Sequence, residues 1–273
     1  MKHLLVFQNI REGIQEVSLN TKQLYANEIE YQLFHDRLLK FLDAEPIHSK
    51  IFSIKGDVLI YLTEHIIPKK HDLRPPILML FGNPAPQSVD AEMYFASHTN
   101  GSEHRIWKVL EEVDFLSFEY DLQNITERNR LRKRDLYELA YHSPFRIGLA
   151  VYYSMPSPAS GPWSGVAGLK KLFGAKAFKK LGEYERHRVE KVINEFVSPV
   201  GSVIAFQKDA YLGIKSFRSP DYALAQAKQG KLLGNCQCDT EVKLFCCPPT
   251  RLIQTRESLE ALKLFKQTIL NVI

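Results

Sequence analysis

Residues 75–116, PPILMLFGNPAPQSVDAEMYFASHTNGSEHRIWKVLEEVDFL, decide the fold class of this 273-residue chain. Five apolar residues at positions 77–81 lie between two prolines and Gly82, a pattern that predicts a buried strand. A Gly-Asn-Pro turn and a loop follow, and residues 106–116 have the apolar spacing of an amphipathic helix. A buried strand followed by such a helix is typical of an open α/β sheet.

Asn83 lies in the turn two residues beyond this expected strand, at the edge of the sheet where α/β proteins bind their ligands. Phe95 and His98 come from the loop that follows and are available to the same edge. A short amide at a strand end can position a water molecule, and an aromatic ring can stack on a planar base. Taken alone, Asn83 is also typical of a turn residue, and Phe95 of a residue in the core.

These segments resemble the uracil-DNA glycosylase superfamily, and especially its mismatch-specific uracil/thymine-DNA glycosylase branch. The pattern of that family is a strand, G-[IV]-N-P-G, a loop carrying H-F-A, and N-R-F-W-[KR]-[VL]-[IL]. The matching pieces here are Gly82-Asn83-Pro84, Tyr94-Phe95-Ala96 and residues 104–110, HRIWKVL. Residues 202–211, SVIAFQKDAY, are similar to the family's V-V-A-F-L-G-K-D-A-Y, and residues 248–252, PPTRL, to its N-P-S-G-L loop.

The resemblance implies a role for each matching residue. Asn83 would orient a water molecule beneath the sugar carbon, and Phe95 would stack on the extruded base. Gly82 and Ala85 would hold the base, and a minor-groove wedge would be formed by Pro249, Thr250, Arg251 and Leu252. The implied activity is that of a monofunctional DNA glycosylase without metal or cofactor. It would hydrolyse the N-glycosidic bond of uracil, or of a related damaged or mismatched pyrimidine, in base-excision repair.

The order of the expected strands and helices predicts a three-layer α/β/α sandwich with a mainly parallel, four-stranded central sheet. The four strands are expected at residues 77–81, 146–153, 203–206 and 241–246. We expect this glycosylase-like domain to occupy residues 73–273. Residues 1–72 carry two helical patterns, at about 20–46 and 49–67, and predict a helical extension packed on the core.

The net charge of +5 is modest, but the positive charge is concentrated in two runs. Five basic residues lie within positions 128–134 and seven within positions 170–188. Such runs favour a surface that neutralises DNA phosphates, although a solvated helix face has the same composition. The chain has no run of about 18 apolar residues, so no membrane partner is expected. The first residues make a poor signal peptide, so we expect a cytoplasmic protein, and one that binds DNA. The sequence shows no heptads and no long apolar edge, so a monomer is the default expectation.

Four cysteines lie within twelve residues near the C-terminus: Cys236, Cys238, Cys246 and Cys247. Thiolates on a hairpin can hold a zinc ion, and this interpretation stays open. The adjacent pair at 246 and 247 would strain a shared tetrahedron, however. Reduced cysteines buried on neighbouring strands are therefore the favoured interpretation.

Two departures from the family pattern keep other functions open. Ala85 stands where the family has glycine, and Pro248, which has no amide hydrogen to donate, stands where it has His or Asn. One alternative is a catalytically silent DNA-binding module of the same fold. The other is an α/β hydrolase that acts on free nucleosides or nucleotides, which needs neither the wedge nor the basic runs.

Overall fold

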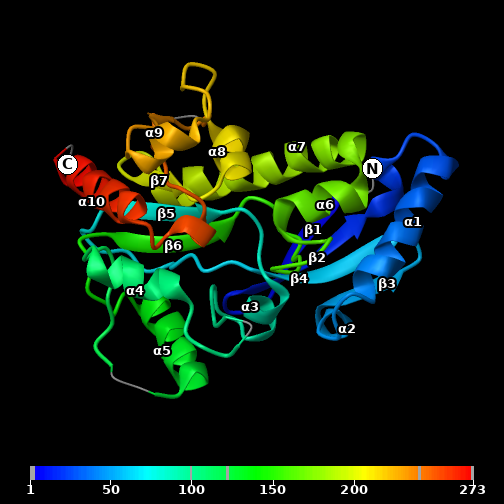
Figure 1. The fold of residues 1–273 in the computed structure, drawn as a ribbon, viewed down its shortest axis with the longest axis horizontal. Coiled ribbons are helices and arrows are strands. Elements are labelled where there is room, and N and C mark those ends of the chain that lie inside the picture. The colour runs from blue at the N-terminus through cyan, green and yellow to red at the C-terminus, as the bar shows by residue number, and fades with distance from the viewer. Residues whose placement is uncertain (1–3, 99, 121–122, 239–240, 272–273) are drawn as a thin grey trace.

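The computed structural model describes residues 4–98, 100–120, 123–238 and 241–271. Within these residues the protein belongs to the α/β class, with an antiparallel sheet of four strands, a mixed sheet of five strands, and helices around them (Figure 1). None of the helices in this part of the chain is both long enough and apolar enough to cross a membrane.

The N-terminal segment forms the antiparallel sheet. Its elements are β1 (Leu5–Arg11), β2 (Ile14–Asn20), η1 (Thr21–Leu24), α1 (Glu28–Leu42), α2 (His48–Ile51), β3 (Phe52–Lys55) and β4 (Val58–Glu64). The strand order is β1-β2-β4-β3. Gly13 turns the chain between β1 and β2, and Gly56 does so between β3 and β4. Both have positive φ, 79° and 58°, a conformation that glycine adopts without steric cost.

The expectation of a wholly helical extension over residues 1–72 is wrong. The first expected helix forms as α1, and Asn27 caps it by accepting a hydrogen bond from the Glu30 amide at 2.9 Å. The second is replaced by the β3–β4 hairpin. In β4 the alternate residues Leu59, Tyr61 and Thr63 are buried, the period of a strand with one face in the core. Pairing with β2 and β3 on both sides outweighs the local helical pattern.

The central sheet has the strand order β6-β5-β7-β9-β8. The strands are β5 (Pro76–Phe81), β6 (Arg146–Val151), β7 (Ser202–Ala205), β8 (Leu233–Asn235) and β9 (Lys243–Cys246). β6, β5, β7 and β9 are parallel neighbours, whereas β8 pairs antiparallel with β9 at the edge.

The expectation of a mainly parallel, four-stranded sheet therefore needs correction. All four expected strands are present, but β8 makes the sheet mixed and five-stranded, and the N-terminal sheet adds only antiparallel pairs. The connection from β8 to β9 is short, and a parallel pairing would need a crossover of about a dozen residues. The strand that closes this edge must therefore run antiparallel.

Helices lie on both faces of the central sheet. They are α3 (Pro86–Asp90), α4 (Arg105–Glu112), α5 (Ile125–Glu138), α6 (Gly165–Phe173), α7 (Ala175–Val192), η2 (Ile193–Val197), α8 (Lys208–Ile214), α9 (Leu224–Lys228), η3 (Thr250–Leu252) and α10 (Arg256–Leu270). Leu78 and Leu80 join a core shared with α6, α7 and the N-terminal sheet. Ile77 and Met79 point the other way, into a core shared with α4, α5 and α10. Figure 1 shows α7 and the α4–α5 pair on opposite sides of β5 and β6.

Candidate functional site at the carboxyl edge of the central sheet

The carboxyl ends of four parallel strands meet at one edge of the central sheet, and Asn83 lies there, two residues beyond β5. Its Nδ2 donates a hydrogen bond to Ser157 Oγ at 2.7 Å and a longer one to the Pro84 carbonyl at 3.2 Å. Ser157 follows β6, so the side chain of Asn83 joins two strand ends. The Asn83 Oδ1 atom accepts no hydrogen bond from the described residues and is left to hold a water molecule or a ligand group.

Phe95 lies at the same edge, against the last residue of β5. Its ring centroid is 4.7 Å from that of Phe81 and 4.6 Å from that of His104. Its φ of 51° is in the left-handed region, which a bulky residue rarely adopts. The indole of Trp107 stabilises this conformation by donating from Nε1 to the Phe95 carbonyl at 3.0 Å. Such strained positions cost on the order of 1–3 kcal/mol and cluster at functional sites.

His98 and His104 extend this aromatic group, and the sequence alone indicated no role for His104. The two imidazole rings stack with centroids 4.5 Å apart. His104 Nδ1 accepts a hydrogen bond from the Ile106 amide at 3.3 Å and so caps α4, which leaves the proton on Nε2 of the neutral ring. Burial, assisted by His98 and Arg105, lowers the pKa of His104 to about 4. His104 is thus a neutral hydrogen-bond donor at neutral pH.

This lowered pKa predicts a specific loss of stability in acid. The folded pKa of His104, about 4, lies below the value of 6.5 expected in the unfolded chain. Protonation therefore favours unfolding, and the stability contributed by the neutral ring is present above pH 6.5 and lost as pH falls toward 4. The shift corresponds to about 3 kcal/mol. We expect His104→Asn, which keeps a helix-capping side chain, to remove this part of the pH dependence of the free energy of unfolding, measured with urea. Identical pH profiles for the two proteins would contradict the assignment.

Gln207 covers the Gly-Asn-Pro turn from the end of β7. A Cβ atom added at Gly82 would overlap the Gln207 carboxamide, so a side chain at position 82 has space only if the Gln207 side chain moves. The carboxamide makes no hydrogen bond with the described residues and offers a donor and an acceptor side by side. Gln207 stands where the family segment has glycine, and this departure is the signal that would have identified it from the sequence.

The same contact predicts a non-additive pair of substitutions. Gly82→Ala should displace the Gln207 side chain and destabilise the protein by about 1 kcal/mol, since overpacking of this kind costs about 1–3 kcal/mol and the Gln207 side chain has a flexible end. In a Gln207→Ala background the added methyl group has space, so the double variant should recover most of that loss. Urea unfolding of the four proteins measures the coupling. Strictly additive effects would show that Gln207 does not lie on Gly82 in solution.

The expected wedge reaches the same edge from β9. Thr250, Arg251 and Leu252 form η3, and the side chain of Arg251 is exposed. Two residues on, the Gln254 carboxamide accepts a hydrogen bond from Arg105 Nη1 at 2.7 Å, which ties this loop to the start of α4 beside His104. The structure thus brings Asn83, Phe95 and the wedge segment to one edge.

The other two expected site positions each come directly before a short helix. Pro249 leads into η3, and Ala85 is the N-cap of α3, with its carbonyl accepting from the Ser88 amide at 3.0 Å. Pro248 is buried.

The basic run at 128–134 is largely neutralised by carboxylates. Arg128 and Arg132 both bind Glu103, and the remaining pairs are Arg130 with Glu127, Lys133 with Glu92 and Arg134 with Asp135. This run is therefore not the free cationic surface expected from the sequence. Three exposed cations near the carboxyl edge, Arg105, Lys208 and Arg251, have no ion-pair partner among the described residues.

A scan against protein-family models and a search of curated proteins find no match to this chain.

The cysteines do not come together as metal ligands. Cys246 and Cys247 are successive residues at the end of β9 and point into different cores, Cys246 with Cys236 on one face of the sheet and Cys247 on the other. Burial raises the pKa of all three of these thiols. No cluster of three or more His, Cys, Asp or Glu side chains suited to a metal ion occurs in the described part of the chain. The zinc interpretation therefore finds no support.

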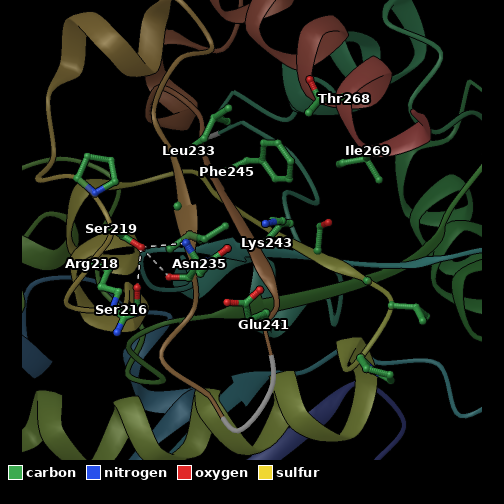
Figure 2. A pocket seen from close by; sticks show the side chains of 17 residues that line it. Ser216, Arg218, Ser219, Leu233, Asn235, Glu241, Lys243, Phe245, Thr268 and Ile269 are labelled. Carbon is green, nitrogen blue, oxygen red and sulfur yellow. Dashed lines mark hydrogen bonds between the residues drawn. The ribbon is translucent and has the colours of Figure 1, made fainter. Parts of the chain in front are cut away.

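A separate cavity of about 720 Å³ lies at the amino ends of β7 and β9, where Ser202 and Lys243 begin these strands (Figure 2). In a parallel sheet this is the edge opposite to Asn83. No site residue expected from the sequence lines the cavity. It is therefore a second region of interest, distinct from the carboxyl edge.

Proposed function

We propose that this protein is a DNA glycosylase that hydrolyses the N-glycosidic bond of uracil, or of a related damaged or mismatched pyrimidine, in DNA. The single observation that carries the proposal is the arrangement at the end of β5. An asparagine with a free Oδ1 atom follows the strand, and an aromatic ring with a strained backbone packs against the last strand residue. The resemblance of the surrounding segments to the glycosylase superfamily supports the same function.

The proposed reaction needs a positioned water molecule and a stabilised leaving group. Asn83 Oδ1 accepts a hydrogen bond from the water, whose oxygen forms a bond to the anomeric carbon while the bond from that carbon to the base nitrogen breaks. The base leaves with the electron pair and takes up the proton that the water releases. Asn is a weak base, so the rate depends on electrostatic stabilisation of the developing charges.

Three further groups suit the departing base. Stacking of the base on Phe95 contributes about 1–3 kcal/mol. Gln207 offers a donor and an acceptor side by side, which complement the N–H and C=O groups on the edge of a pyrimidine. The neutral imidazole of His104 can donate a hydrogen bond to the departing base without first being protonated.

The proposal includes the mode of DNA binding. Arg105, Lys208 and Arg251 are exposed cations suited to backbone phosphates, and Leu252 with Arg251 suits a wedge in the minor groove. It also includes a three-layer α/β/α arrangement of residues 73–273, a monomeric state and a cytoplasmic location.

A specific observation favours a second candidate, the silent DNA-binding module. The Gln207 side chain fills the space against Gly82 beside the turn that would receive the base. Pro248 adds to this, because it stands where the family pattern has His or Asn, and a proline side chain can neither donate nor accept a hydrogen bond. Ala85 adds a methyl group where the pattern has glycine. Such a module would keep salt-sensitive DNA binding without base release.

Base release from a panel of labelled oligonucleotides separates these functions. The panel carries uracil, thymine mismatches, hypoxanthine and oxidised pyrimidines, each in single and double strands, at low salt. We expect excision from at least one pyrimidine substrate. Binding without excision would indicate the silent module, and Arg251→Glu should then weaken that binding and lower its salt dependence. Neither binding nor excision would overturn both candidates and direct the search to free nucleosides.

A further inference from the structure

The cavity at the amino edge is built on the face of the β8–β9 hairpin. Leu233 pairs with Phe245 and Asn235 with Lys243, so these four side chains share one face of the sheet. The last turn of α10, with Ile269, closes one side, and the loop at 199–202 and the turn at 216–220 close the others. Segments far apart in the sequence therefore form one hollow.

The two ends of this cavity differ in chemistry, as Figure 2 shows. Leu233, Phe245 and Ile269 gather at one end, and Arg218, Glu241 and Lys243 lie toward the other. Phe245 and Ile269 are almost fully buried, whereas Leu233, the first residue of β8, is 41% exposed. The exposed side chain of Leu233 therefore gives the apolar end of the cavity a surface that an apolar ligand would cover.

The turn at 216–220 is fixed by its own hydrogen bonds, which leaves recognition to the charged groups. Ser219 Oγ accepts from the Asn235 amide at 2.8 Å and donates to the Asn235 carbonyl at 2.9 Å. The Ser216 hydroxyl bonds to Ser219 at 2.9 Å. Arg218 and Lys243, by contrast, form no ion pair with any described residue, and neither does Glu241. Two cations and one anion give the polar end a net positive charge.

We propose that this cavity binds a small organic anion with an apolar body and a carboxylate head. The body would lie against Leu233, Phe245 and Ile269, and the carboxylate would lie near Lys243 and Arg218. The volume of about 720 Å³ falls within the range of small-molecule sites, roughly 300–1,000 Å³. The inference is independent of the glycosylase proposal, since none of these residues belongs to the carboxyl edge.

Calorimetric titration of the full chain with octanoate tests the proposal, and octylammonium, which has the same body and the opposite charge, serves as the matched probe. We expect octanoate to bind with a dissociation constant on the order of 0.1 mM at low salt, and octylammonium at least tenfold more weakly. Arg218→Glu combined with Lys243→Glu should weaken octanoate binding about tenfold. Leu233→Asp, which changes only the apolar end, should weaken it by a similar factor.

Two control variants keep the test specific to the cavity. Lys231→Glu reverses the charge of an exposed lysine just before β8 that does not line the cavity, and it should change octanoate binding less than twofold. Asn83→Ala should leave it unchanged. No binding of octanoate, equal binding of octylammonium, or an equal loss in Lys231→Glu would each overturn the proposal.

Discussion

Asn83→Ala is expected to lower the rate of base release about 100-fold while leaving the fold intact, because misplacement of a reacting group by about 1 Å can cost about 10² in rate. The side chain is half-buried and its removal breaks one strong hydrogen bond, that from Nδ2 to Ser157 Oγ. The water molecule would lose its acceptor, whereas the apolar cores on both faces of the sheet would be untouched. Single-turnover excision of the preferred substrate, measured beside the thermal unfolding midpoint, separates the two effects.

Ser157→Ala is the matched control for this experiment. It removes the acceptor of the Nδ2 hydrogen bond and leaves Oδ1 in place, so the amide is less well oriented but still present. We expect an intermediate loss of about tenfold, with DNA affinity unchanged in both variants. An active wild-type protein whose excision rate survives Asn83→Ala would show that the reaction is performed elsewhere on the molecule.

Glu185→Ala is expected to give a very large loss of stability, about 3–5 kcal/mol in the free energy of unfolding. Glu185 is fully buried on α7. One carboxylate oxygen accepts from the Ser154 amide at 2.7 Å and from the Ser154 hydroxyl, and the other accepts from Arg188 Nε at 2.7 Å. Truncation would leave the Arg188 guanidinium, itself only 13% exposed, without its counter-charge.

This network also connects the N-terminal sheet to the candidate site. Tyr61 of β4 bonds through its hydroxyl to Ser154 Oγ at 2.8 Å, and Ser154 lies three residues before Ser157, the partner of Asn83.

Urea unfolding measures the loss of stability in Glu185→Ala, with Glu185→Gln as the control that keeps an acceptor and removes the charge. We expect the glutamine variant to lose about 1–2 kcal/mol. A loss below about 1 kcal/mol in Glu185→Ala would mean that the network contributes little to stability.

The central strands were predictable because each is a short apolar run between turn residues. The run at 77–81 became β5 nearly residue for residue, and the other three expected strands formed within two residues of their predicted ends. The largest differences are two residues, at the carboxyl end of β6, which stops at 151, and at the start of β9, which begins at 243. The strand β8 was missed because three residues, Leu233–Asn235, are too few to show a period. β4 was read as helix because its residues are apolar on both faces, and only pairing with β2 and β3 decides between the two conformations.

In the candidate site, too, some features could be predicted from the sequence and others depend on tertiary contacts. The sequence predicted that Asn83 lies at the sheet edge, since a residue just beyond a buried strand must lie there, and the structure has it there. Phe95 was indicated by the loop that follows and by the family resemblance, and its ring lies against Phe81 at the same edge. The sequence assigned no role to His104, Ser157 or Gln207. Their contacts join them to residues 6, 74 and 125 positions away in the chain: His98, Asn83 and Gly82. It also misjudged the basic run at 128–134, because the carboxylates that neutralise it include Glu92 and Glu103, which lie well before it in the chain.

By itself the sequence determined the α/β class, the central strands and the residues that follow them, because these depend on local apolar period and on turn-forming residues. Tertiary structure alone decided the antiparallel N-terminal sheet, the antiparallel pairing of β8 with β9, the ion pairs of the basic run at 128–134 and the amphipathic cavity. Each of these is an interaction between segments distant in the chain. The free energy that selects them comes from burial and hydrogen bonding across that distance, which no local pattern records.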